Sequence, residues 1–76
     1  GPGADGHALL RRVVDALPEA QRLALTLYYY EERAVAEVAA MLGQPEATVK
    51  THLHRGRQAL RARLAEQGLG DPALWR

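Results

Sequence analysis

The fold is decided by residues 45–64, PEATVKTHLHRGRQALRARL, which combine an apolar stripe with a run of positive charge. Apolar or small residues recur here at intervals of three and four, the spacing of the buried side of a helix. These residues are Val49, Leu53, Gly56, Leu60 and Leu64. Positions 48–63 hold five lysine or arginine residues and no acid, in a chain of formal net charge +1. Such concentrated positive charge is typical of a surface that contacts nucleic acid.

A shorter helix and a tight turn are predicted just before this stretch. The apolar residues of that helix share the same helical spacing, and they are Val35, Val38, Ala39 and Leu42. Gly43 follows where a left-handed backbone ends a helix without steric cost, and Pro45 suits the first position of the next helix. Two helices joined by a short glycine-containing turn form a helix-turn-helix, whose second helix enters the DNA major groove.

The rest of the sequence predicts an all-α fold, a compact four-helix bundle with the helix-turn-helix at its C-terminal end. A first helix is expected to open at Asp5-Gly6 and to run to Leu17. Pro18 is expected to be the first residue of a second helix that is apolar around most of its circumference. Glu31-Glu32-Arg33 marks the break before the third helix. The chain is divided into an expression-tag remnant, a folded domain and a C-terminal tail, at residues 1–3, 4–67 and 68–76.

Six residues on the apolar stripes are expected to be buried together, because each faces inward from its helix. They are Leu27, Val38, Leu42, Val49, Leu53 and Leu60. Gly56 costs about 1 kcal/mol inside a helix, so its place on the stripe indicates close approach by a neighbouring helix, or else a tolerated weakness. Three consecutive tyrosines, residues 28–30, cannot all face inward. At least one ring is therefore expected to be partly exposed.

Composition excludes several classes of protein. The 76 residues include no cysteine, so disulfides and thiolate metal sites are absent, and no apolar run is long enough for a membrane span. A cytoplasmic location is expected. His52 and His54 are two positions apart and point to different faces of a helix, so no metal site is expected, and no cofactor. No nucleophile or acid–base pair is recognisable, and we expect no enzyme.

An ordered set of short motifs between Asp15 and Leu64 resembles region 4, the C-terminal promoter-recognition domain of bacterial extracytoplasmic-function sigma factors. These motifs are Leu17-Pro18-Glu19, Arg22, an apolar helix ending in tyrosines, Glu37-Val38-Ala39, Leu42-Gly43, Thr48-Val49-Lys50, the HRGR of residues 54–57, and Leu60. The resemblance implies that residues 4–67 read the −35 element of promoter DNA in transcription initiation. It also implies docking on the β flap of RNA polymerase and possible masking by an anti-sigma factor.

Two departures from the family pattern bear on these expectations. Residues 32–39 lack the small polar residue that usually caps the third helix, so another group must cap that end or it frays. A complete sigma factor also has a preceding domain that melts promoter DNA. The chain is therefore expected to be a fragment, or a free-standing regulator built on the same domain.

The expected site residues fall into two sets. The first set faces DNA, with five residues toward the major groove and two nearer the phosphates: Lys50, Thr51, His52, His54 and Arg55, then Arg57 and Arg61. The second set is an apolar partner surface on the first two helices: Leu10, Val14, Leu23, Tyr28, Tyr29 and Tyr30. The segment from Asp15 to Glu37, which overlaps this surface, carries five acids against two arginines.

Two alternative functions compete with this interpretation. The DNA-binding domain of LuxR-type response regulators also has four helices and a similar T-V-K-x-H sequence. The Leu17-Pro18-Glu19 segment, the tyrosine run and the HRGR favour the sigma factor. The other alternative is a helical protein-interaction module whose basic face binds an acidic partner.

Overall fold

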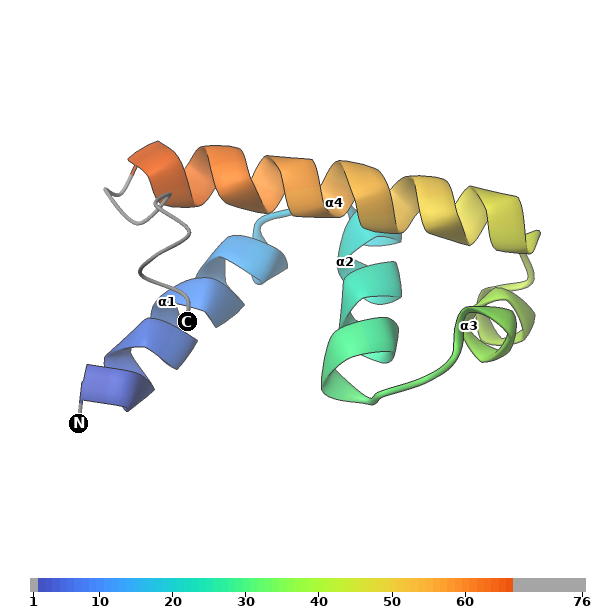
Figure 1. The fold of residues 1–76 in the computed structure, drawn as a ribbon, viewed down its shortest axis with the longest axis horizontal. Coiled ribbons are helices and arrows are strands. Elements are labelled where there is room, and N and C mark those ends of the chain that lie inside the picture. Colours follow the sequence, from blue (N-terminus) through green and yellow to red (C-terminus); the bar gives the residue numbers. More distant parts are fainter. Residues whose placement is uncertain (1, 67–76) are drawn as a thin grey trace.

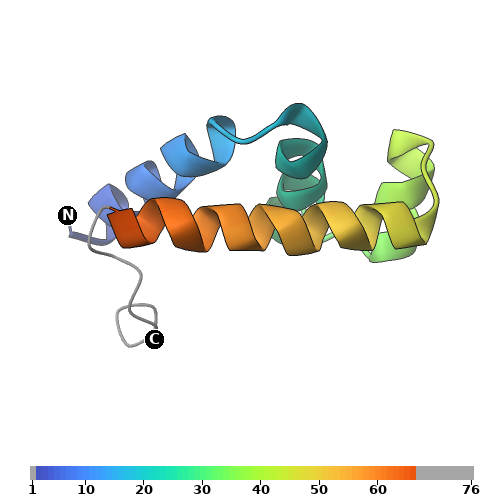
Figure 2. The ribbon, with the colours of Figure 1, turned by 90° about the horizontal axis from the view of Figure 1, so that it is seen from above.

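The computed structural model describes residues 2–66, within which four α-helices and one π-helical turn form an all-α fold, as predicted. In chain order they are α1 (Pro2–Asp15), α2 (Glu19–Leu25), η1 (Thr26–Tyr30), α3 (Val35–Leu42) and α4 (Glu46–Glu66). The long helix α4 extends along the molecule, with α3 near its N-terminal end, α2 near its middle and α1 toward its C-terminal end (Figure 1 and Figure 2). None of the described helices has the length and apolarity needed to cross a membrane.

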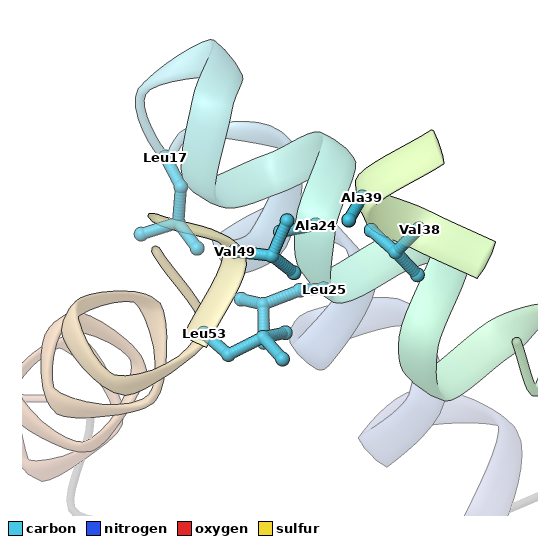
Figure 3. Close-up of a cluster of buried hydrophobic side chains, with 7 residues drawn as sticks. All are labelled: Leu17, Ala24, Leu25, Val38, Ala39, Val49 and Leu53. Atoms are coloured by element: carbon cyan, nitrogen blue, oxygen red, sulfur yellow. The ribbon is translucent and has the colours of Figure 1, made fainter. Parts of the chain in front are cut away.

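The core lies where α2 and α3 pack against the N-terminal half of α4 (Figure 3). Its buried residues are Leu17, Ala24, Leu25, Val38, Ala39, Val49 and Leu53. The burial predicted for Val38, Val49 and Leu53 is confirmed. The same prediction was wrong in degree for three residues, which are only partly buried and pack against the edge of the cluster: Leu27, Leu42 and Leu60.

Gly56 sets how closely α2 and α4 approach each other. A Cβ atom at this position would lie 2.7 Å from Leu25 Cδ1 and 3.5 Å from Gln21 Cβ. The expected close approach of a neighbouring helix is therefore confirmed. Because Leu25 is itself 2% exposed, any side chain at position 56 would have to displace a well-packed core residue.

The helices α2 and α4 each begin one residue later than predicted, and α1 begins earlier than predicted by more than one residue. The helix α1 begins at Pro2, not at Asp5-Gly6, so Pro2 and Gly3 belong to its first turn. Pro18 and Pro45 each precede a helix, and their carbonyls accept the N–H groups of Arg22 at 2.9 Å and Val49 at 3.1 Å. A residue just before a helix supplies a carbonyl but needs no N–H partner, which suits proline. The predicted tail, residues 68–76, lies outside the described residues.

The turn of the helix-turn-helix has the predicted glycine geometry. Gly43 is left-handed, with φ 65° and ψ 35°. Its N–H donates to the carbonyl of Ala40 at 3.3 Å, and the N–H of Gln44 donates to that of Ala39 at 3.0 Å. This pair of bonds is the Schellman motif, which satisfies carbonyls that the end of α3 would otherwise leave without partners.

At the start of α3 a glutamate binds the backbone of the N-cap residue Ala34, while no side chain takes the place of the missing serine or threonine. The backbone N–H of Ala34 donates to Glu37 Oε1 at 3.0 Å, and Arg33 pairs with the same carboxylate at 3.6 Å. Glu37 also lies in the first turn of α3, where the helix dipole favours a negative charge.

The end of the second helix widens into the π-helical turn η1. The N–H of Glu31 donates to the carbonyl of Thr26 at 3.1 Å, five residues back. Glu32 then adopts a left-handed φ of 54°, so the predicted break at Glu31-Glu32-Arg33 is confirmed. The wide turn itself was not predicted.

Candidate nucleic-acid interface

The helix α4 has a buried side and a cationic side. Val49 and Leu53 point into the core, while the cationic residues occupy the remaining circumference. Most of the predicted DNA-facing residues are exposed, namely Lys50, Thr51, His54, Arg55 and Arg61. The other two, His52 and Arg57, are half-buried. The structure thus keeps all seven on one helix but leaves two of them close to the protein body.

Four of these residues form a continuous stripe, one on each successive turn of α4. They are Lys50, His54, Arg57 and Arg61. With a rise of 1.5 Å per residue, this stripe is about 16 Å long. Arg55 lies further around the helix, on the exposed surface opposite the buried residues.

Among the side chains that the structure describes, residues 8–66, the lysine and arginine residues of α4 form no ion pair with an acid. In residues 2–66 the ion pairs join Arg11 to Asp15 at 3.3 Å and Arg33 to Glu37 at 3.6 Å. Both pairs lie outside α4. Its lysine and arginine side chains are therefore available to an external anion, as phosphate contacts require.

Thr51 is exposed but is partly committed to its own helix. Its hydroxyl donates to the carbonyl of Ala47 at 3.1 Å, one turn back. This bond uses the hydroxyl proton and leaves the oxygen free to accept. Toward an external group Thr51 can therefore act as a hydrogen-bond acceptor.

A contact that the sequence does not predict joins the two expected surfaces. Arg57 Nη1 donates a hydrogen bond to the hydroxyl of Tyr29 at 3.0 Å, across 28 positions of the chain. The ring of Tyr29 also meets that of Tyr28 edge-on, with centroids 4.9 Å apart. No spacing rule within one helix could have found this contact, because it depends on how α4 packs beside η1.

The apolar partner surface is smaller than expected. Val14 is 2% exposed and belongs to the buried interior, because its side of α1 packs toward the rest of the bundle. Leu10, Leu23 and Tyr28 are half-buried. The exposed part consists of Tyr29 and Tyr30, which are 51% and 45% exposed.

Tyr30 carries a cation on its ring. The guanidinium carbon of Arg11 lies 5.1 Å from the ring centroid, within range of a cation–π interaction.

Residues 2–66 hold no group of three or more histidine, aspartate or glutamate side chains placed to bind a metal ion.

Comparison with known families and proteins assigns this helix-turn-helix. Residues 7–60 match the family described as Sigma-70, region 4. The chain belongs to this family. The resemblance seen in the motifs is thereby confirmed, and the sigma factor is favoured over the LuxR-type alternative.

Curated relatives carry sigma-factor names. The chain is 42% identical over 50 residues to the ECF RNA polymerase sigma factor SigW of Bacillus subtilis, covering 66% of this chain and 27% of that protein. It is 39% identical over 70 residues to the RNA polymerase sigma-E factor of Streptomyces coelicolor, covering 92% and 40%. It is also 41% identical over 60 residues to the sigma factor FliA of Pseudomonas aeruginosa, covering 79% and 24%. The region 4 chain thus spans less than half the length of these relatives.

Proposed function

We propose that this region 4 chain is the −35-recognition domain of an extracytoplasmic-function type of sigma factor. It binds promoter DNA through α4 and thereby directs RNA polymerase in transcription initiation. It acts in the bacterial cytoplasm, by binding and not by catalysis.

The observation that carries this proposal is the cationic face of α4 in the helix-turn-helix, which forms no ion pair with any acid in the described part of the chain. Lys50, His54 and Arg55 project from the N-terminal half of the helix, the part that a helix-turn-helix presents to base edges. Arg61 lies two turns further along, where contact with the phosphate backbone is expected. The family match supports this use of the helix.

The direct test begins with selection of duplexes from a randomised library by the chain. Binding of a selected duplex is then compared with that of a base-shuffled duplex over a range of salt concentrations. We expect tighter binding to the selected duplex and a linear fall of log affinity with log salt for both. Weak binding without preference, together with tight binding to an acidic protein, would instead support the protein-interaction module.

Arg61→Ala is expected to weaken binding to selected and shuffled duplexes by the same factor. A phosphate contact adds affinity but carries no sequence information. The slope of log affinity against log salt should fall by about one unit. Arg61→Lys keeps the charge and should keep the slope. A loss confined to the selected duplex would contradict the phosphate role.

A second surface is proposed for protein partners, centred on Tyr29 and Tyr30 with half-buried Leu10 and Leu23 beside them. Exposed aromatic rings next to apolar surface are typical of contact sites. The partner is the β flap of RNA polymerase, and an anti-sigma factor is proposed to compete for this surface. Support comes from the exposure of the two rings, which are 51% and 45% exposed.

Tyr30→Ala is expected to weaken binding of the chain to purified RNA polymerase core enzyme at least about thirtyfold, the loss of at least about 2 kcal/mol that truncation of a hot-spot anchor causes. Titration of labelled chain with core enzyme gives the affinity. Arg55→Ala, on the outer surface of α4, is the control and should bind the polymerase normally. Loss of polymerase binding in Arg55→Ala but not in Tyr30→Ala would show that the two faces are reversed.

A further inference from the structure

The hydrogen bond between Arg57 and Tyr29 joins α4 to the end of the second helix. It connects a cation of the proposed DNA-binding stripe to a tyrosine hydroxyl at 3.0 Å. The two residues are 28 positions apart, so the contact exists only in the folded domain. This bond holds the guanidinium end of the Arg57 side chain on the surface that is proposed to face DNA.

The hydroxyl of Tyr29 is itself held in place. The wide turn of η1 carries Tyr28 and Tyr29 side by side, and their rings meet at 85° with centroids 4.9 Å apart. Tyr28 in turn packs against the core cluster. A chain of contacts therefore leads from the core through two rings to the guanidinium of Arg57.

Arg57 differs from its neighbours on the stripe. Lys50, His54 and Arg61 are exposed, whereas Arg57 is half-buried beside η1. A guanidinium has five N–H donors, so one bond to Tyr29 leaves four for other acceptors. A free arginine loses much side-chain entropy when it binds a phosphate, and one already held in place loses less.

We propose that Tyr29 is a positioning residue for DNA binding, which acts by holding the guanidinium of Arg57 ready for a backbone phosphate. The inference rests on the proposed function of α4. It assigns to the tyrosine run a role in the DNA interface that is separate from docking of a protein partner. The contribution is to affinity on every duplex, because a phosphate contact carries no sequence information.

The test removes only the hydroxyl. Tyr29→Phe is expected to lower affinity about three- to tenfold on selected and shuffled duplexes alike, the usual effect of one lost hydrogen bond. The salt slope should stay unchanged because Arg57 keeps its charge, whereas Arg57→Ala should reduce the slope by about one unit. In an Arg57→Ala background, Tyr29→Phe should have no further effect. Tyr28→Phe removes the neighbouring hydroxyl but keeps the ring pair, and should bind as the parent does.

Two results would overturn the proposal. Parent-like affinity in Tyr29→Phe would mean that the hydrogen bond does not contribute to binding. Equal losses from Tyr29→Phe with and without Arg57 would mean that Tyr29 contacts DNA itself. Equal melting temperatures of the parent and Tyr29→Phe confirm that the comparison concerns binding and not folding.

A readout without DNA separates this proposal from the function on which it rests. In the free protein, the heteronuclear NOE of the Arg57 guanidinium nitrogens should indicate an ordered side chain. In Tyr29→Phe that order should be lost. If order is lost but the parent binds no duplex, the proposed function fails while the positioning of Arg57 stands. If the order is the same in both proteins, the positioning role is wrong even when DNA binding is normal.

Discussion

Replacing Leu53 with alanine is expected to destabilise the domain more than any other single change considered for this chain. Leu53 is 3% exposed and packs with Leu25 and Val49 where α2 meets α4. Truncation of a buried leucine costs about 2–5 kcal/mol, which is a large share of the stability of a small domain. Urea unfolding followed by circular dichroism should show a much lower midpoint, or no cooperative transition.

Leu60→Ala is the matched control for this prediction. It makes the same chemical change on the same helix, but Leu60 is only partly buried at the edge of the cluster. Its loss of stability should be clearly smaller. A Leu53→Ala protein that unfolds like the parent would mean that α4 is not packed against α2 as described.

Arg55→Ala is expected to reduce discrimination between DNA sequences. Arg55 is exposed on the outer surface of α4, where an arginine can form two hydrogen bonds to the edge of a guanine. Loss of such a contact should narrow the gap in binding free energy between a selected and a shuffled duplex by roughly 1–3 kcal/mol. The ratio of the two dissociation constants measures this gap.

Arg61→Ala provides the comparison, because it should change both constants and leave their ratio intact. The two variants remove the same side chain from the same helix and differ only in the position along it. Equal proportional losses on both duplexes for Arg55→Ala would remove Arg55 from base recognition. The division of α4 into a base-reading part and a phosphate-binding part would then be wrong.

Much of the fold could be predicted from the sequence because its signals are local. The glycine that ends α3 and the periodic stripe of Val49 and Leu53 each depend on residues within one or two turns. Gly56 also predicted the close approach of a neighbouring helix. A glycine inside a helix lowers helix stability, and close packing against Leu25 explains why it is present on the apolar stripe.

The features that were missed depend on tertiary packing or on a choice between similar turns. Nothing in the tyrosine run distinguishes a π-helical turn from an ordinary helix end. Val14 and Leu10 have similar apolar side chains, but only the way α1 packs decides that Val14 is buried. The bond from Arg57 to Tyr29 joins residues 28 positions apart and has no counterpart in the periodicity.

In the candidate site, too, local features could be predicted and the effects of tertiary packing could not. The sequence placed the cationic residues on one helix, because charge and spacing are both visible in it. It did not reveal which of them the fold restrains. His52 and Arg57 are half-buried only because other parts of the chain pack beside them.

The two-sided arrangement of α4 limits how this domain can diverge. Core and cationic residues are immediate neighbours in the chain, as in Val49-Lys50, Leu53-His54 and Gly56-Arg57. Each residue advances about 100° around the helix, so insertion or deletion of one residue within α4 would move all later cations out of the cationic stripe and expose later core positions. Under the proposed function, new DNA preferences therefore arise on α4 by substitution, whereas changes of length are confined to the connections between helices.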